Sequence, residues 1–280
     1  MKCLFLTGLL AATIAFPAIG EDSDGAARAR DIMQKVEDRP DGSDSIARTE
    51  ISITDRFGET NSVEILRIRR DFGPEGRDQF TFSFIVDPEE MAGTRVLTRD
   101  FYDIETTDDQ WILIPGIDEV KRIAVDSYTS RLMGSDITYG DLSTRDLDHY
   151  DFTLEGEEKV GEWNTTVITF TPKSQEEIDR FGYVRGKVWV DTESFLVVRS
   201  IFDMKQPGQS KLFMAHETAF IDGYWSPLDM SFVTQLDGNV ISTTRMKLHD
   251  ARFDIGVPED LFETDALYTY SAAEMLPVSN

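Results

Sequence analysis

The sequence of 280 residues is poor in cysteine and in positive charge. Its single cysteine, Cys3, lies close to the N-terminus, so we expect no disulfide to stabilise the fold. Acidic residues number 52 against 28 lysines and arginines, which gives a formal net charge of −24. Nucleic acids and anionic membranes are bound through basic patches, so this charge argues against both as partners.

Sequence motifs for metal, nucleotide and covalent chemistry are also missing. The three histidines, His149, His216 and His249, lack the spacing of zinc ligands, and no cysteine stands near them. There is no nucleophile elbow, P-loop or dinucleotide-binding glycine motif. The acids between Asp100 and Asp109 lack the order of a calcium-binding EF-hand loop. We therefore expect neither a metal ion nor a cofactor.

Long apolar runs are confined to the first residues. Lys2 precedes an apolar stretch over residues 3–16, and small residues follow up to Gly20. This order is typical of a secretory signal peptide, and the stretch is shorter than the roughly 20 residues of a membrane-spanning helix. We predict a signal peptide over 1–20, cleavage between Gly20 and Glu21, and a single exported domain over 21–280.

Beyond that segment, apolar and polar residues alternate in a way that predicts mostly β structure after one helix. Residues Gly25–Asp38 carry an apolar stripe at helical spacing. In QFTFSFIV (79–86), phenylalanines alternate with small polar residues, as in a strand. Short turns join such segments, so neighbouring strands should pair antiparallel. The predicted strands are Thr49–Asp55, Ser62–Phe72, Gln79–Val86, Arg95–Tyr102, Trp111–Ile114, Tyr150–Glu155, Thr165–Thr171, Tyr183–Asp191, Phe195–Asp203, Lys211–Ile221, Leu228–Leu236 and Val240–Ile255.

Two short helices are predicted between these strands. Asp87–Gly93 begins with an acid followed by Pro88, which suits the start of a helix. Ser174–Gly182 begins with a Ser-x-x-Glu capping box and ends at a glycine. The whole pattern is mainly β with a few helices. A sandwich, a closed barrel or a strongly curved sheet around helices would each satisfy it.

The segment RLMGSDITYGDLSTRDLDHYDF (131–152) combines acids, hydroxyl residues and one histidine. Helix capping accounts for five of them, namely Ser135, Asp136, Ser143, Thr144 and Asp146. His149 has Asp148 and Asp151 as sequence neighbours, an arrangement that could form an acid/base pair. We interpret the segment as a pair of capped helices and not as an active site.

The same segment resembles a known family. Residues 131–142, RLMGSDITYGDL, resemble the MGSD-[FI]-[ST]-Y-x-DL signature of the outer-membrane lipoprotein-sorting proteins, which are part of the LolA/LolB-like superfamily of periplasmic carriers. Further segments agree with that family in the same order, including RDFG (70–73), QWILIP (110–115), VWVD (188–191), DGYWSP (222–227) and VPEDLF (257–262). The agreement extends from about residue 30 to residue 263.

The resemblance implies a strongly curved antiparallel sheet, an incomplete β-barrel, covered by helices and enclosing an apolar hollow. It also implies a periplasmic carrier or chaperone for lipid or lipoprotein acyl chains, working beside an inner-membrane exporter of the resistance-nodulation-division (RND) type. Segment 131–152 would form the lid of the hollow. The predicted ligand-binding residues are Ile32, Met33, Val36, Phe80, Phe82, Phe84, Ile112, Ile114, Met133, Ile137, Tyr139, Leu142, Leu196, Val198, Phe202, Met214, Met230 and Phe232.

Two other functions are compatible with the sequence. The chain could be an interaction subunit that docks on an exporter without carrying lipid, with its acidity serving basic docking surfaces. It could also be a hydrolase that uses His149 and nearby acids. We predict a carrier, and no enzyme, because holding acyl chains needs buried apolar area and no catalytic group.

Overall fold

The structure of the chain is a computed structural model that describes residues 23–103, 106–117, 119–123, 128–143 and 145–275. The predicted signal peptide, with its cleavage site between Gly20 and Glu21, lies outside these residues.

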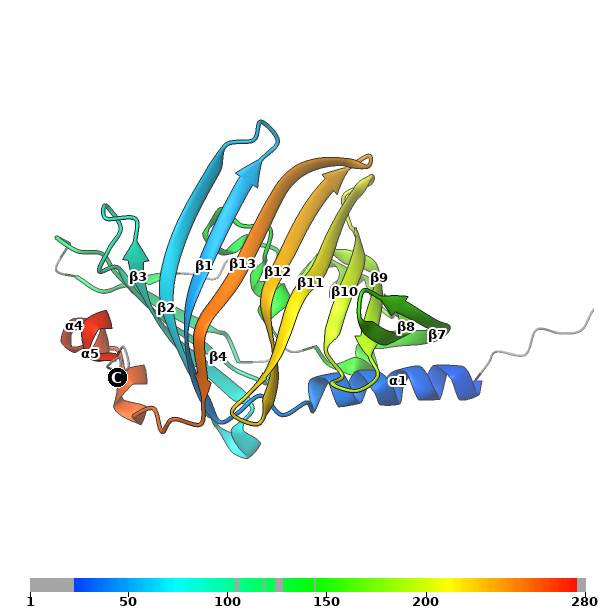
Figure 1. Cartoon of the computed structure of the whole chain (residues 1–280), viewed down its shortest axis with the longest axis horizontal. Coiled ribbons are helices and arrows are strands. Elements are labelled where there is room, and N and C mark those ends of the chain that lie inside the picture. Colours follow the sequence, from blue (N-terminus) through cyan, green and yellow to red (C-terminus); the bar gives the residue numbers. More distant parts are fainter. Residues whose placement is uncertain (1–22, 104–105, 118, 124–127, 144, 276–280) are drawn as a thin grey trace, which may run out of the picture.

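Within the described residues, thirteen strands form one antiparallel sheet that curves strongly and does not close (Figure 1). The order across the sheet is β6-β5-β4-β3-β2-β1-β13-β12-β11-β10-β9-β8-β7, so most neighbours in space are also neighbours in sequence. The strands are β1 (Asp44–Asp55), β2 (Thr60–Phe72), β3 (Asp78–Asp87), β4 (Arg95–Asp100), β5 (Asp109–Leu113), β6 (Lys121–Ile123), β7 (Tyr150–Val160), β8 (Trp163–Pro172), β9 (Tyr183–Asp191), β10 (Val197–Met204), β11 (Gln209–Ile221), β12 (Tyr224–Leu236) and β13 (Asn239–Phe253).

Helices lie at both ends of the sheet and behind it (Figure 1). The α helices are α1 (Ser23–Glu37), α2 (Tyr139–Leu142), α3 (Gln175–Phe181), α4 (Ala266–Thr269) and α5 (Ala272–Met275). The 3-10 helices are η1 (Pro74–Gly76), η2 (Leu132–Gly134), η3 (Leu147–His149) and η4 (Glu259–Phe262). In the described part of the chain, none of these helices has the length and apolar character needed to cross a bilayer.

The predicted fold class is confirmed: the chain is mostly β, with one curved, unclosed antiparallel sheet and short helices. The predicted helix after Ser174 is also confirmed, since Ser174 accepts a hydrogen bond from the Glu177 backbone and Gly182 ends the helix in the left-handed conformation. The prediction of a helix at Asp87–Gly93 was wrong. That segment forms consecutive turns, with Met91 N donating to Pro88 O at 2.9 Å and Ala92 N to Glu89 O at 3.2 Å.

The two faces of the sheet are covered by different segments. We call the face that segment 128–149 lies on the inner face, since Lys211, Thr234 and Thr244 bind that segment there. Helix α1 packs on the same face at the β7–β9 end. Its predicted apolar stripe is turned to the sheet, with Ala29 and Met33 buried.

The C-terminal segment covers the opposite face. The register from β13 through β1 and β2 to β3 puts Ile51 and Ile85 on the inner face and Phe82 and Phe84 on the opposite one. There the two phenylalanines are buried with apolar residues of η4 and α4, such as Leu261. This part of the sheet therefore has its own core, separate from the inner face.

Candidate functional site

The inner face holds a cavity of about 340 Å³ between α1, strands β7 to β12 and segment 141–147. Such a volume lies in the range of small-molecule sites, about 300–1,000 Å³. Most of its wall is apolar, formed by Met33, Val36, Leu147, Tyr150, Phe152, Phe170, Val188, Val197, Phe202, Phe213 and Phe232. The polar residues of the wall are Glu37, Asp141, Ser143, Arg145, Ser200 and Lys211.

Aromatic packing shapes the cavity wall. The Phe170 and Phe202 rings meet edge to face with centroids 6.0 Å apart, and Phe202 also packs on Tyr183 at 4.7 Å. Gly186 on β9 makes room for this arrangement, because a Cβ there would stand 2.3 Å from Cζ of Phe170. This distance is far shorter than any contact between non-bonded carbon atoms. The Phe170 ring can therefore occupy its position only because residue 186 has no side chain.

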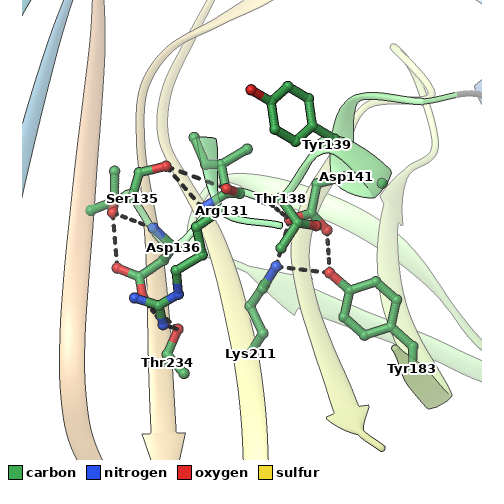
Figure 2. Close-up of polar contacts among 12 residues, drawn as sticks. Arg131, Ser135, Asp136, Thr138, Tyr139, Asp141, Tyr183, Lys211 and Thr234 are labelled. Atoms are coloured by element: carbon green, nitrogen blue, oxygen red, sulfur yellow. Dashed lines mark hydrogen bonds and ion pairs between the residues drawn. The ribbon is translucent and has the colours of Figure 1, made fainter. Parts of the chain in front are cut away.

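Segment 128–149 is held on the sheet by two carboxylates, one buried and one partly buried, shown in Figure 2. The first is Asp136, which is 1% exposed. Its carboxylate accepts hydrogen bonds from the hydroxyls of Thr234, Ser242 and Thr244, the last at 2.8 Å. Its backbone N–H donates to Thr244 Oγ1 at 2.8 Å, and Arg131 lies 3.5 Å from the carboxylate. These bonds join residues about 100 positions apart in the sequence.

The second carboxylate, Asp141, binds the ammonium group of Lys211 at 2.5 Å and also accepts a hydrogen bond from the Tyr183 hydroxyl (Figure 2). Lys211 further donates to the Tyr183 oxygen at 2.8 Å. Burial raises the pKa of Asp141, but the charge of Lys211 and the donated hydrogen bonds outweigh it and hold that pKa below its usual value. For Lys211, burial lowers the pKa more than Asp141 raises it. The pair closes one side of the cavity.

A second cavity, of about 530 Å³, adjoins the first at Lys211, which belongs to the walls of both. It is lined mainly by polar residues, among them Arg131, Asp136, Thr138, Lys205 and Gln209. The Asp141–Lys211 contact therefore stands where an apolar cavity meets a polar one. Moving segment 128–149 would change access to both.

The capping role predicted for this segment needs correction. Asp146 does cap η3, accepting from the Asp148 backbone at 2.9 Å, but Asp136 is no cap and is buried against the sheet. The residue before α2 is Thr138, which forms a capping box with Asp141. Ser143 donates to the Tyr139 carbonyl. Thr144 lies outside the described residues.

His149 has other partners than its sequence neighbours. Its ring nitrogens lie 3.4 Å from Glu177 and 3.8 Å from Asp146. Asp148 instead pairs with Arg30, and Asp151 with Lys173. In the part of the chain that the structure describes, no three His, Cys, Asp or Glu side chains come together as a metal site.

Four of the predicted ligand-binding residues line the apolar cavity: Met33, Val36, Phe202 and Phe232. Ile32 packs against the buried apolar residues between α1 and strands β7 to β9, such as Phe152 and Phe170. Tyr139 and Ile137 lie in segment 128–149, where the Tyr139 hydroxyl donates to Gln110 at 2.9 Å and Ile137 is buried.

The other predicted residues lie elsewhere. Phe80, Phe82 and Phe84 belong to the core under the C-terminal segment. Leu196, Val198 and Met214 pack around Trp189, and Met230 is buried in β12. Ile114, Met133 and Leu142 are exposed, and Ile112 in β5 is partly buried.

Several cavity residues were missed by the sequence analysis. Tyr150, Phe152 and Phe170 stand in strands that were predicted, yet alternation alone does not say which face is covered. Lys211 carried a weak signal, since it is a cation followed by Leu212 and Phe213, whereas Arg145 stands between a threonine and an aspartate and carried none.

A protein-family model described as "-like: Uncharacterized protein" matches residues 77–269. The chain belongs to this family. The matched range includes β3 to β13, segment 128–149 and most of the cavity wall, with α1, β1 and β2 preceding it. The match thus covers the part of the chain that holds Asp136 and Asp141.

Several solved structures share the fold of this chain. One is a DUF1329 family protein from Desulfovibrio piger, with 25% identity, a TM-score of 0.75 and coverage of 87% of this chain and 99% of that chain. Another is a putative outer membrane lipoprotein-sorting protein domain from Vibrio parahaemolyticus, with 24% identity, a TM-score of 0.72 and coverage of 86% and 99%. A LolA superfamily protein from Nitrosomonas europaea follows, with 16% identity, a TM-score of 0.59 and coverage of 85% and 98%.

A comparison with curated proteins gave no match. The structural neighbours confirm the predicted resemblance to the lipoprotein-sorting proteins and the LolA/LolB-like superfamily as a likeness of fold.

Proposed function

We propose that the chain is a periplasmic carrier that binds acyl chains of lipids or lipoproteins in the inner-face cavity. The observation that carries the proposal is the apolar and aromatic wall of that cavity, beneath a segment that the carboxylates of Asp136 and Asp141 bind to the sheet. The fold shared with a lipoprotein-sorting domain supports it. In this proposal the mature chain, 21–280, acts as one domain without a cofactor and without catalysis.

The size of the hydrophobic effect is sufficient for such a role. Each buried methylene contributes about 0.8 kcal/mol, so ten buried methylenes contribute about 8 kcal/mol. That free energy corresponds to a dissociation constant of about 1 μM before the cost of ordering the chain. A carrier needs such reversible affinity, because it must also release its cargo.

Segment 128–149 would act as the lid. Two residues of the lid, Asp136 and Asp141, anchor it to the sheet, because their carboxylates bind side chains of β11 to β13. Releasing these bonds together with the hydrogen bond from Tyr139 to Gln110 would free the segment without unfolding the sheet. We further propose, from the family resemblance, that the partner is an RND-type inner-membrane exporter. Site-specific crosslinking in cells tests that partner separately from cargo binding.

A tryptophan in the cavity tests the carrier function. Val36 of α1 lines the cavity, so Val36→Trp should fill part of it and weaken binding of the neutral fluorescent probe N-phenyl-1-naphthylamine at least tenfold. The matched control is Val240→Trp on β13, where Val240 is 51% exposed and outside the cavity wall. Binding that is equal in both variants, or absent from the unaltered protein, would contradict the proposal.

A further inference from the structure

Arg145 is held at the cavity wall by aromatic rings. Its guanidinium carbon lies 5.0 Å from the ring centroid of Phe181, 5.1 Å from that of Tyr183 and 5.7 Å from that of Phe202. One nitrogen donates to the Gly140 carbonyl at 3.2 Å. Rings around a guanidinium restrict its orientation and lower its hydration, so the group is prepared for a partner.

The guanidinium still has unused hydrogen-bonding capacity. Arginine carries five N–H donors, and the structure gives Arg145 one hydrogen bond. Among the described residues, no carboxylate oxygen lies within 4.0 Å of it, whereas Lys211 in the same wall is paired with Asp141 at 2.5 Å. Arg145 therefore contributes a positive charge to the cavity that no ion pair of the described chain neutralises.

One acid in the wall competes for this charge. Glu37 of α1 lines the same cavity, and burial raises its pKa while the charge of Arg145 lowers it. The net direction is upward, so the protein favours the neutral form of Glu37 more than water does. The hydrogen bond that Arg145 donates goes to the Gly140 carbonyl and not to Glu37, so the other four N–H groups of the guanidinium stay available to an incoming anion.

We infer that Arg145 binds the anionic headgroup, carboxylate or phosphate, of a single-chain amphiphile whose acyl chain occupies the apolar part of the cavity. The inference rests on the proposed carrier function and names the class of its ligand. A planar guanidinium binds either anion through two parallel hydrogen bonds, which a lysine could not do. The chain's net charge of −24 repels anions in general, so selection for an anion has to come from this local site.

Three ligands of equal chain length show whether the site prefers a carboxylate, a phosphate or a neutral headgroup. Hexadecanoate, hexadecyl phosphate and the neutral hexadecanol are each titrated, below their aggregation limits, against the protein loaded with N-phenyl-1-naphthylamine. The unaltered protein should bind at least one of the two anions about tenfold or more tightly than the alcohol, as expected for a charge-assisted hydrogen-bonded pair. Whichever anion binds more tightly identifies the source, a free fatty acid or a phosphate headgroup.

Arg145→Gln keeps hydrogen-bonding capacity but removes the charge. In this variant the preference for the anion should fall to about twofold or less, while the affinity for hexadecanol is unchanged. The control is Arg199→Gln, because Arg199 also stacks on an aromatic ring, Trp189 at 4.4 Å, but is outside the cavity wall. The Arg199→Gln variant should prefer the anion over hexadecanol as strongly as the unaltered protein does.

The outcomes distinguish this inference from the carrier function on which it rests. Equal binding of acid and alcohol by the unaltered protein overturns the role of Arg145 and leaves the carrier function intact. A preference that survives in Arg145→Gln, or an equal loss of all ligands in that variant, also overturns it. If the unaltered protein binds neither the probe nor any of the three ligands, the carrier function itself fails.

Discussion

Replacing Lys211 with methionine should destabilise the protein by about 3 kcal/mol. The Lys211 side chain is 4% exposed, and its ammonium lies 2.5 Å from Asp141, whose side chain is 11% exposed. Methionine keeps the length of the apolar stem but leaves the Asp141 carboxylate buried without its cation. Removing one partner of a buried ion pair typically costs about 3–5 kcal/mol, most of it for the charge that remains.

A double-mutant cycle isolates this interaction. Asp141→Asn alone should also be costly, but the Lys211→Met/Asp141→Asn protein should lose about 1–3 kcal/mol less than the sum of the single variants. Urea unfolding followed by tryptophan fluorescence gives the four free energies. Lys159→Met, at an exposed lysine of β7, should stay within about 0.5 kcal/mol. Additive losses, or a Lys211→Met loss no greater than that of the control, would refute a buried ion pair.

The same pair predicts an acid dependence. The pKa of Asp141 in the folded protein lies below its usual value of 3.8, because Lys211 and the donated hydrogen bonds outweigh the effect of burial. A carboxyl whose folded pKa is lowered stabilises the protein above its unfolded pKa, and this contribution is lost as pH falls through the folded value. The loss of stability below about pH 4 should therefore be less steep in Asp141→Asn than in the unaltered protein.

Three further substitutions test other parts of the structure by the same urea unfolding. Gly186→Ala should cost about 1–3 kcal/mol, because its Cβ would stand 2.3 Å from Phe170; a neutral result would contradict the tight packing. Asp136→Ala removes the shared acceptor of three hydroxyls and should cost about 3 kcal/mol. It should also speed hydrogen exchange in residues 128–143, and unchanged exchange there would argue against its anchoring role. Burial and two neighbouring acids raise the pKa of Asp100 to about 7, so its ionisation costs stability as pH rises from 4 to 7. Asp100→Asn should therefore stabilise by about 1 kcal/mol at pH 7.5 and have little effect at pH 4, and equal effects at both pH values would exclude this cause.

The strands were largely predictable because their pattern is local. Alternation located β9 at Tyr183–Asp191 with its observed bounds, and the capping box located α3. The three residues of β6, Lys121–Ile123, are too few to show a period, and this strand was missed. The helix expected after Asp87 failed because its capping signals also suit a series of turns.

The functional site was less predictable because it depends on contacts between distant residues. Alternation shows that Phe82 and Phe84 share a face, but not that the C-terminal segment covers it. Asp136 in a Gly-Ser-Asp sequence suggests a surface cap until β12 and β13 bring three hydroxyls to it. Lys211 is an unusual residue for a core, and only the distant Asp141 explains why its burial is tolerated.

Native mass spectrometry of the purified protein, followed by extraction and identification of any bound lipid, tests the carrier function most directly. A carrier should hold an acyl-containing species at a stoichiometry of about one, which Val36→Trp loses and Val240→Trp keeps. A protein that carries no such species, and that also takes up no single-chain amphiphile on addition, would contradict it.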